Sequence, residues 1–231
     1  KKLNIDAKIF MPTPTPLQKV QQVRMFGEDR VEVILVGDTF DDAKVEAMRY
    51  SELHQSTVIH PFDDPKIMEG QGTIALEILA AAKAPIDYVF VPIGGGGVAS
   101  GVSSVFKALS PDTKIIGVEP KGAASMSTSI DKDENTELHL IDKFVDGAAV
   151  KKVGDLTFQI CKQNLEKVLT VDEGKICETI LNLYNKDAIV VEPAGALTLA
   201  ALEQFSEEIK DFPEVELWRK STIPLGNLKI N

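Results

Sequence analysis

The feature that most restricts the fold of this chain is a regular alternation between short apolar runs and helical patterns. The runs are rich in β-branched residues, and three of the clearest are 31–37 (VEVILVG), 87–94 (DYVFVPIG) and 113–120 (TKIIGVEP). Strands that alternate with helices are typical of βα units, which build a parallel sheet. Strands that are apolar throughout indicate that helices cover both faces of the sheet. The sequence therefore predicts an α/β fold with doubly wound, mostly parallel sheets.

The same pattern continues along the chain and falls into two parts. Residues 56–72 are rich in turn formers and charges, so we place a boundary near Pro61. The parts are two doubly wound subdomains: residues 1–60, the remainder of a smaller one that we expect to begin before Lys1, and residues 61–231. Further strands are predicted at 7–12, 56–62 and 168–172, an apolar segment at 188–193, an acidic loop at 131–140, and helices at 16–26, 41–55, 72–82, 100–109, 122–129, 155–164, 173–184 and 194–209.

The composition argues against several classes of partner. The chain of 231 residues carries a formal net charge of −10 and has a pI near 4.9. Nucleic acids and anionic membrane surfaces select basic patches, so neither is expected, and no apolar run reaches the length of about 18 residues that spans a bilayer. Cys161 and Cys177 have no metal-binding spacing and are predicted to be free, buried thiols. We expect a cytoplasmic protein that binds a small molecule.

Four consecutive glycines, Gly94 to Gly97, follow an apolar strand and precede a helical pattern. Glycine loses more backbone entropy on folding than any other residue, so such a run needs a reason. Between a strand and a helix, missing side chains let backbone N–H groups and the helix dipole approach an anion. The pattern is neither GxGxxG nor GxxxxGK[ST], so dinucleotides and nucleoside triphosphates fit poorly. A phosphate monoester fits best, and the alternative is a tight turn without a ligand.

Four phrases around this loop carry a wider resemblance. They are VPIGGGGVASGV, KIIGVEP, FVDGAAV and VVEPAGAL, in that order along the chain. Together they resemble the pyridoxal-phosphate enzymes of the tryptophan-synthase β-type fold. The phrases GDTFDDA and HPFDDPKIMEGQGT are similar to the threonine dehydratase (threonine deaminase) branch, which includes serine dehydratases and serine racemase. The resemblance runs over about residues 1–210 and implies pyridoxal 5′-phosphate as cofactor, bound in a crevice between the two subdomains.

The resemblance also implies roles for individual residues. The cofactor phosphate would be wrapped by Gly94, Gly95, Gly96 and Gly97. Gly147 would lie beside the cofactor ring, where a missing Cβ leaves room for the aromatic plane, and Glu192 would come near the ring edge. From the residues alone, Gly147 could instead only make a turn, and Glu192 could be an ordinary helix N-terminal carboxylate.

A metal site is not expected. In related racemases, the glutamate of GVEP binds a divalent cation with a backbone carbonyl four residues on and an aspartate six residues on. Glu119 and Ala123 match the first two places, but the third is Ser125, so we interpret Glu119 as a capping or solvated carboxylate. The adjacent acids Asp63 and Asp64 are predicted to be turn and N-cap groups rather than a catalytic pair.

The resemblance implies dehydration and deamination of L-threonine to 2-oxobutanoate and ammonia, in the isoleucine pathway or in catabolism. The resemblance implies that the Schiff-base lysine lies upstream of Lys1. Lys107 and Lys114 read as surface residues, so no catalytic residue is nominated in this chain. L-Serine dehydration and serine racemisation are alternatives of the same class. A non-catalytic fragment that binds a phosphate ligand is an alternative of another class.

The resemblance further implies that the protein is a homodimer or homotetramer and that its substrate is a small amino acid. Its contact to the pyridine nitrogen would come from the tail. There the sequence departs from the family pattern after about Lys210.

Overall fold

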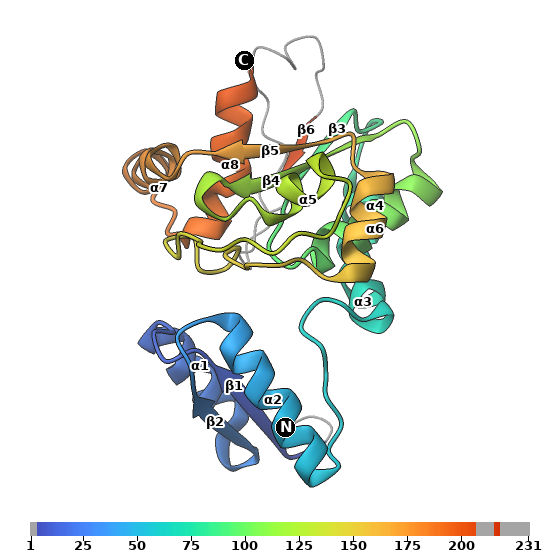
Figure 1. Ribbon diagram of the computed structural model, residues 1–231. Helices are drawn as coiled ribbons and strands as arrows, with labels where there is room; N and C mark the ends of the chain where they lie inside the picture. The colour runs from blue at the N-terminus through green and yellow to red at the C-terminus, as the bar shows by residue number, and fades with distance from the viewer. Residues whose placement is uncertain (1–3, 207–214, 218–231) are drawn as a thin grey trace. The chain divides into compact units, whose positions relative to one another are not determined.

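The computed structural model describes residues 4–206 and 215–217 (Figure 1). The chain divides into two compact units, residues 1–59 and 60–231, called unit 1 and unit 2 below. The part of the tail that would contact a pyridine nitrogen, and the end of the helix predicted at 194–209, lie outside the described residues. In the described residues, no helix has both the length and the apolar character needed to cross a bilayer.

Unit 1 contains two βα pairs. Its elements are β1 (Ala7–Met11), α1 (Leu17–Gly27), the 3₁₀ turn η1 (Glu28–Arg30), β2 (Val31–Leu35) and α2 (Phe40–His54). The two strands pair in parallel, with Ile9 opposite Val33. α2 begins with a capping box, in which Thr39 and Asp42 each accept a hydrogen bond from the other's backbone amide. These bonds satisfy two of the amides that the start of a helix leaves unpaired.

Unit 2 has a sheet of four parallel strands. The strands are β3 (Tyr88–Pro92), β4 (Lys114–Pro120), β5 (Lys167–Val171) and β6 (Val215–Leu217), in the spatial order β5-β4-β3-β6. The helices are α3 (Pro65–Ala81), α4 (Gly97–Leu109), α5 (Ser125–Asp131), α6 (Asp155–Asn164), α7 (Glu173–Asp187) and α8 (Pro193–Phe205), with a 3₁₀ turn η2 (Lys121–Ala123). Parallel strands joined by helices confirm the predicted α/β fold.

The core of unit 2 lies between its sheet and α8, which contacts β3, β4 and β5 (Figure 1). α8 is buried from Ala194 to Leu202. Phe90 of β3 and Ile116 of β4 pack in one buried cluster with Leu197 of α8. Val89, on the opposite face of β3, is also fully buried. Burial of both strand faces explains why the strands are apolar throughout.

The strand predicted at 56–62 is wrong. This segment forms no strand in the structure; it leads into a turn closed by the ring of His60. The Nδ1 atom of His60 accepts hydrogen bonds from the amides of Phe62 and Asp63, at 3.3 and 2.7 Å. The side chain thus occupies backbone donors that a sheet would need. The apolar segment 188–193 forms no strand either.

The start of α3 also differs from the prediction. The helix begins at Pro65 rather than at residue 72, because Asp64 accepts a hydrogen bond from Lys66 N at 2.8 Å and caps it. Proline at the first helical position has no amide to satisfy and already has helical φ. The charged residues and glycines of this segment predicted a loop, but Asp64 and Pro65 form the start of a helix that continues through the glycines.

The two cysteines differ in exposure. Both are free, but Cys161 of α6 is buried and Cys177 of α7 is exposed, so the prediction of two buried thiols is wrong for Cys177. Ile176 faces the core, and its neighbour along a helix points about 100° away, toward solvent. Burial raises the pKa of the Cys161 thiol to about 12, which keeps the thiol protonated.

α3 and α4 cross closely because glycines meet at their contact. A Cβ atom added at Gly101 would overlap the carbonyl oxygen of Met68 and lie 2.8 Å from the amide nitrogen of Gly72. A Cβ atom added at Gly72 would lie 3.0 Å from Cγ2 of Val105. The glycine pair therefore sets the distance between the helices and fixes α4, which follows the glycine loop.

We expect Gly101→Ala to lower the free energy of unfolding by about 1–3 kcal/mol, because the added methyl group overlaps the backbone of α3. Gly70→Ala is the matched control, since a Cβ atom there meets nothing within 4 Å. It should raise the free energy of unfolding by about 0.5–1 kcal/mol through helix propensity. Urea denaturation followed by circular dichroism measures both changes, and equal effects would contradict the close crossing.

Candidate active site

The glycine loop connects the end of β3 to the start of α4. Gly96 is the N-cap residue of α4, and its φ of 94° lies in the left-handed region that favours glycine. Just before the loop, the amide of Ile93 donates to the carbonyl oxygen of Val118 at 2.8 Å, which continues the pairing of β3 with β4. The loop therefore lies at the carboxyl end of the parallel strands, where α/β folds bind their ligands.

The amides of the loop leave donors available for an anion. In the part of the chain that the structure describes, Gly94, Gly95 and Gly96 donate no backbone hydrogen bond to a protein acceptor. The carbonyl oxygen of Gly96 accepts from Ser100 N at 2.8 Å and begins α4, a helix of 13 residues. Unused amides at the positive end of a helix dipole, with no side chain in the way, fit a phosphate group.

Three of the four glycines are also required by the packing of the protein itself. A Cβ atom at Gly95 would overlap the ring of Phe62, and one at Gly97 would lie 3.0 Å from the Cα atom of Phe62. At Gly96, a Cβ atom would come within 2.8 Å of the Cβ and Oγ1 atoms of Thr157. The tight turn and the anion site are therefore not exclusive, because the same missing side chains serve both.

The structure brings Gly94 and Gly147 together. A Cβ atom at Gly94 would lie 3.3 Å from the carbonyl oxygen of Gly147 and 3.2 Å from the Cα atom of Ala148. Gly147 belongs to a turn in which Ala148 N donates to the carbonyl oxygen of Val145 at 2.9 Å. Two glycines far apart in the sequence thus lie side by side, as a shared site requires.

Glu192 is the N-cap residue of α8. Its carbonyl oxygen accepts from Gly195 N and Ala196 N, at 2.9 and 3.2 Å, and Pro193 occupies the first helical position. The carboxylate makes no capping hydrogen bond to α8, although it stands beside the helix start. The side chain is half-buried.

Glu119 is a fully buried carboxylate at the end of β4. Its Oε1 atom accepts from Met126 N at 2.7 Å, and its Oε2 atom accepts from Ser127 N at 2.8 Å, so it caps α5. Burial raises the pKa of Glu119 to about 7, although both amide hydrogen bonds favour the ionised form. Of the two roles predicted for this residue, the structure shows the capping one; the solvated one is wrong, because the side chain is fully buried.

Ala123 and Ser125 are the other two positions compared above with the cation site of related racemases. Ala123 and Ser125 are buried and lie at and after the turn that joins β4 to α5. Both carboxylate oxygens of Glu119 are already used by amides. Among the residues that the structure describes, no three His, Cys, Asp or Glu side chains form a group that could hold a metal ion.

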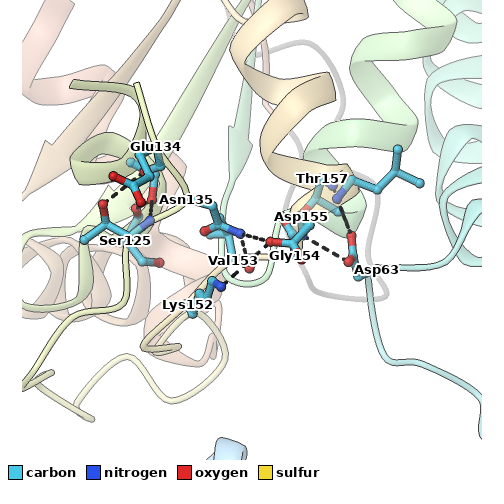
Figure 2. A network of polar contacts seen from close by, with 12 residues as sticks. Asp63, Ser125, Glu134, Asn135, Lys152, Val153, Gly154, Asp155 and Thr157 are labelled. Atoms are coloured by element: carbon cyan, nitrogen blue, oxygen red, sulfur yellow. Dashed lines mark hydrogen bonds and ion pairs between the residues drawn. The ribbon is translucent and has the colours of Figure 1, made fainter. Parts of the chain in front are cut away.

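The adjacent acids Asp63 and Asp64 point to different helices, as predicted for capping groups. Asp64 caps α3, whereas Asp63 caps α6, more than ninety residues away in the chain (Figure 2). Asn135, from the acidic loop, joins the same place by donating to Asp155 Oδ1 at 2.6 Å and to the carbonyl oxygen of Val153 at 3.2 Å. The start of α6 is thus tied to two distant segments.

Sequence reasoning missed Phe62 and Thr157, which both pack against the glycine loop. Neither is near the loop in the sequence, and an isolated Phe or Thr gives no signal of its own. The short phrase HPFDD shows an acid pair, but no pattern tells which distant helix start it serves. The surface positions predicted for Lys107 and Lys114 are confirmed, since both are exposed.

Residues 1–212 match the family described as pyridoxal-phosphate dependent enzyme. The chain belongs to this family, and the predicted resemblance is confirmed. The loop geometry described above is therefore found in a chain whose family uses a phosphorylated cofactor.

Within the family, the chain is similar to proteins named for threonine dehydratase activity. The chain is 58% identical over 208 residues to "L-threonine dehydratase biosynthetic IlvA" of Halalkalibacterium halodurans, which covers 90% of this chain and 50% of that protein. The protein of the same name from Staphylococcus aureus is 54% identical over 214 residues, covering 91% and 51%. The chain thus spans about half the length of the curated relatives it matches.

Solved structures of the same branch of enzymes are also similar to this chain. The processed form of threonine deaminase isoform 2 from Solanum lycopersicum is 40% identical with a TM-score of 0.86, over 96% of this chain and 64% of that chain. Serine racemase from Dictyostelium discoideum is 29% identical with a TM-score of 0.79, over 95% and 70%.

The raised pKa of Glu119 predicts a pH dependence of stability. The folded state holds this proton up to about pH 7, while the unfolded chain releases it near 4.5, so the contribution of Glu119 falls as the pH rises between these values. The slope should be about 1.4 kcal/mol per pH unit, since the unfolded state binds one proton fewer. Glu119→Gln should remove this slope, although it also loses a hydrogen bond. Urea unfolding from pH 5 to 8 measures the difference, and parallel curves for both proteins would contradict it.

Proposed function

We propose that the protein containing this chain is a biosynthetic threonine dehydratase, which converts L-threonine to 2-oxobutanoate and ammonia with pyridoxal phosphate. The observation that carries the proposal is the 58% identity over 208 residues to a protein named for this activity. The similarity to solved threonine deaminase supports it at the level of structure.

When bound, pyridoxal phosphate would act as the electron sink for the charge that develops when the substrate loses its α-proton. We assign its phosphate to the amides of Gly94, Gly95, Gly96 and Gly97. Support comes from the left-handed φ of Gly96 and from loop amides with no protein acceptor in the described chain. These groups are fixed before the ligand arrives, so binding costs little reorganisation.

Gly147 and Glu192 complete the assignment. Gly147 is assigned to the side of the cofactor ring, because its backbone lies against Gly94. Glu192, the N-cap residue of α8, is assigned to the ring edge because its phrase VVEPAGAL resembles the family. Neither residue would form a bond to the substrate in this proposal; both would shape the space around the ring.

The Schiff-base lysine is proposed to lie upstream of Lys1 in the full-length protein. We further propose that the enzyme works in the cytoplasm as a homodimer or homotetramer, as is common in its family. The substrate is proposed to be a small amino acid, and L-threonine is favoured over L-serine by the names of the relatives.

One other activity has a specific observation behind it. Serine racemase of Dictyostelium discoideum shares 29% of the residues and a TM-score of 0.79 with this chain. The racemase would act on the same substrate atom with the same cofactor. Kinetics with L-serine and L-threonine separate the two activities.

We expect the full-length protein to bind pyridoxal 5′-phosphate about 100-fold or more tightly than pyridoxal, because at least two charge-assisted hydrogen bonds to the phosphate are lost with pyridoxal. Equilibrium dialysis measures both dissociation constants. L-Threonine should then yield 2-oxobutanoate, detected as its phenylhydrazone. D-Serine produced from L-serine would favour the racemase, and cofactor binding without turnover of either amino acid would favour the non-catalytic module.

A further inference from the structure

The carbonyl group of Gly95 is held from the side of α6. Thr157 Oγ1 donates to it at 2.7 Å, and Gly154 N donates to it at 3.3 Å. The Thr157 hydroxyl also lies 3.2 Å from the carbonyl oxygen of Gly154, but it has one proton, and the contact with Gly95 is the shorter. Thr157 is fully buried, so water cannot replace this bond without a rearrangement.

Thr157 is itself held by Asp63. The Oδ1 atom of Asp63 accepts from Leu156 N and Thr157 N, both at 3.1 Å, and its Oδ2 atom accepts from Asp155 N at 3.0 Å (Figure 2). A carboxylate that accepts three amides at a helix start is a strong cap, since the ionised acceptor strengthens each bond. A Cβ atom at Gly154 would overlap this carboxylate, so the approach is tight.

Gly95 is also in contact with Phe62, the neighbour of Asp63 in the sequence. The ring of Phe62 lies where a Cβ atom of Gly95 would be. One short segment, Phe62 and Asp63, therefore presses on the loop directly and also fixes the helix start that holds the loop carbonyl. The Gly95–Gly96 peptide has little freedom to rotate between these contacts.

Because a peptide bond is planar, fixing the carbonyl group of Gly95 also fixes the direction of the N–H group of Gly96. The peptide between Gly95 and Gly96 is planar and trans, because the described chain has no cis peptide bond. The C=O of Gly95 and the N–H of Gly96 therefore point in opposite directions. Since the carbonyl points toward Thr157, the amide of Gly96 must point away from α6, and no residue that the structure describes accepts a hydrogen bond from it.

We propose that Thr157, held by Asp63, is a positioning residue that aims the Gly96 amide at the phosphate of the cofactor. This rests on the proposed function, because it assumes that the loop binds pyridoxal phosphate. Thr157 touches neither cofactor nor substrate; it acts through the Gly95–Gly96 peptide. Its effect should be confined to ligands that carry the phosphate.

The test compares three variants of the full-length protein. Thr157→Val keeps the shape of the side chain and removes the hydroxyl, whereas Thr157→Ser keeps the hydroxyl. Thr179→Val is the matched control, because Thr179 is 1% exposed and its hydroxyl contacts Glu203 rather than the loop. Equilibrium dialysis gives the dissociation constants of pyridoxal 5′-phosphate and pyridoxal for each protein, and thermal melting checks that each is folded.

We expect Thr157→Val to weaken the binding of pyridoxal 5′-phosphate about tenfold, because the charge-assisted hydrogen bond from the Gly96 amide to the phosphate is lost. The binding of pyridoxal should be unchanged. Thr157→Ser should stay within about threefold of the wild type for both ligands, and Thr179→Val should match the wild type. If Thr157→Val unfolds, Asp63→Asn should give the same selective loss, because it weakens the cap that holds Thr157.

Equal weakening of both ligands in Thr157→Val, or no weakening of either, would overturn the positioning role while leaving the proposed function intact. A wild-type protein that binds both ligands equally would overturn the proposed phosphate site, and the positioning role with it. The ratio of the two dissociation constants therefore separates the two failures.

Discussion

The site in unit 2 depends on close contact between backbone segments at the glycine loop. Gly94 meets the Gly147–Ala148 turn, Gly95 and Gly97 meet Phe62, and Gly96 meets Thr157. Four glycines cost about 2–4 kcal/mol in backbone entropy relative to alanine. A side chain at any one of three of these positions would overlap fixed neighbours, at about 1–3 kcal/mol each. Glycine is therefore the less costly choice even before a ligand is considered.

At the end of the neighbouring strand β4, the buried carboxylate of Glu119 also fixes a helix start, that of α5. α5 has seven residues, too few for a helix to be stable alone. Glu119 supplies acceptors for two of its first amides and so ties α5 to the end of β4. The pKa of about 7 indicates that the cost of burying the charge exceeds what the two hydrogen bonds return. Glu119 therefore fixes the start of α5, but its contribution to the free energy of unfolding falls as the pH rises toward 7.

Local patterns predicted most of the fold, and contacts between distant segments account for what they missed. The α/β fold and the bounds of α6 followed from hydrophobic periodicity, because that signal lies within one element. The strand predicted at 56–62 failed because the imidazole of His60 takes the backbone donors. For the site, the glycine run identified the loop, since a strand–glycine–helix order is local. Phe62 and Thr157 gave no signal, because their importance arises only where the folded chain places them.

Cofactor binding and folding should be coupled in this unit. The loop is shaped by three segments that are far from it in the sequence, Phe62–Asp63, Gly147–Ala148 and Gly154–Thr157. The unfolded chain cannot present the same set of amides, so a ligand bound by them stabilises only the folded state. At a free concentration 100 times the dissociation constant this amounts to about 2.7 kcal/mol. A weaker Thr157 anchor would therefore reduce both the affinity for the cofactor and the stability that the cofactor adds, while the stability without cofactor would fall only by the loss of one buried hydrogen bond, about 1 kcal/mol.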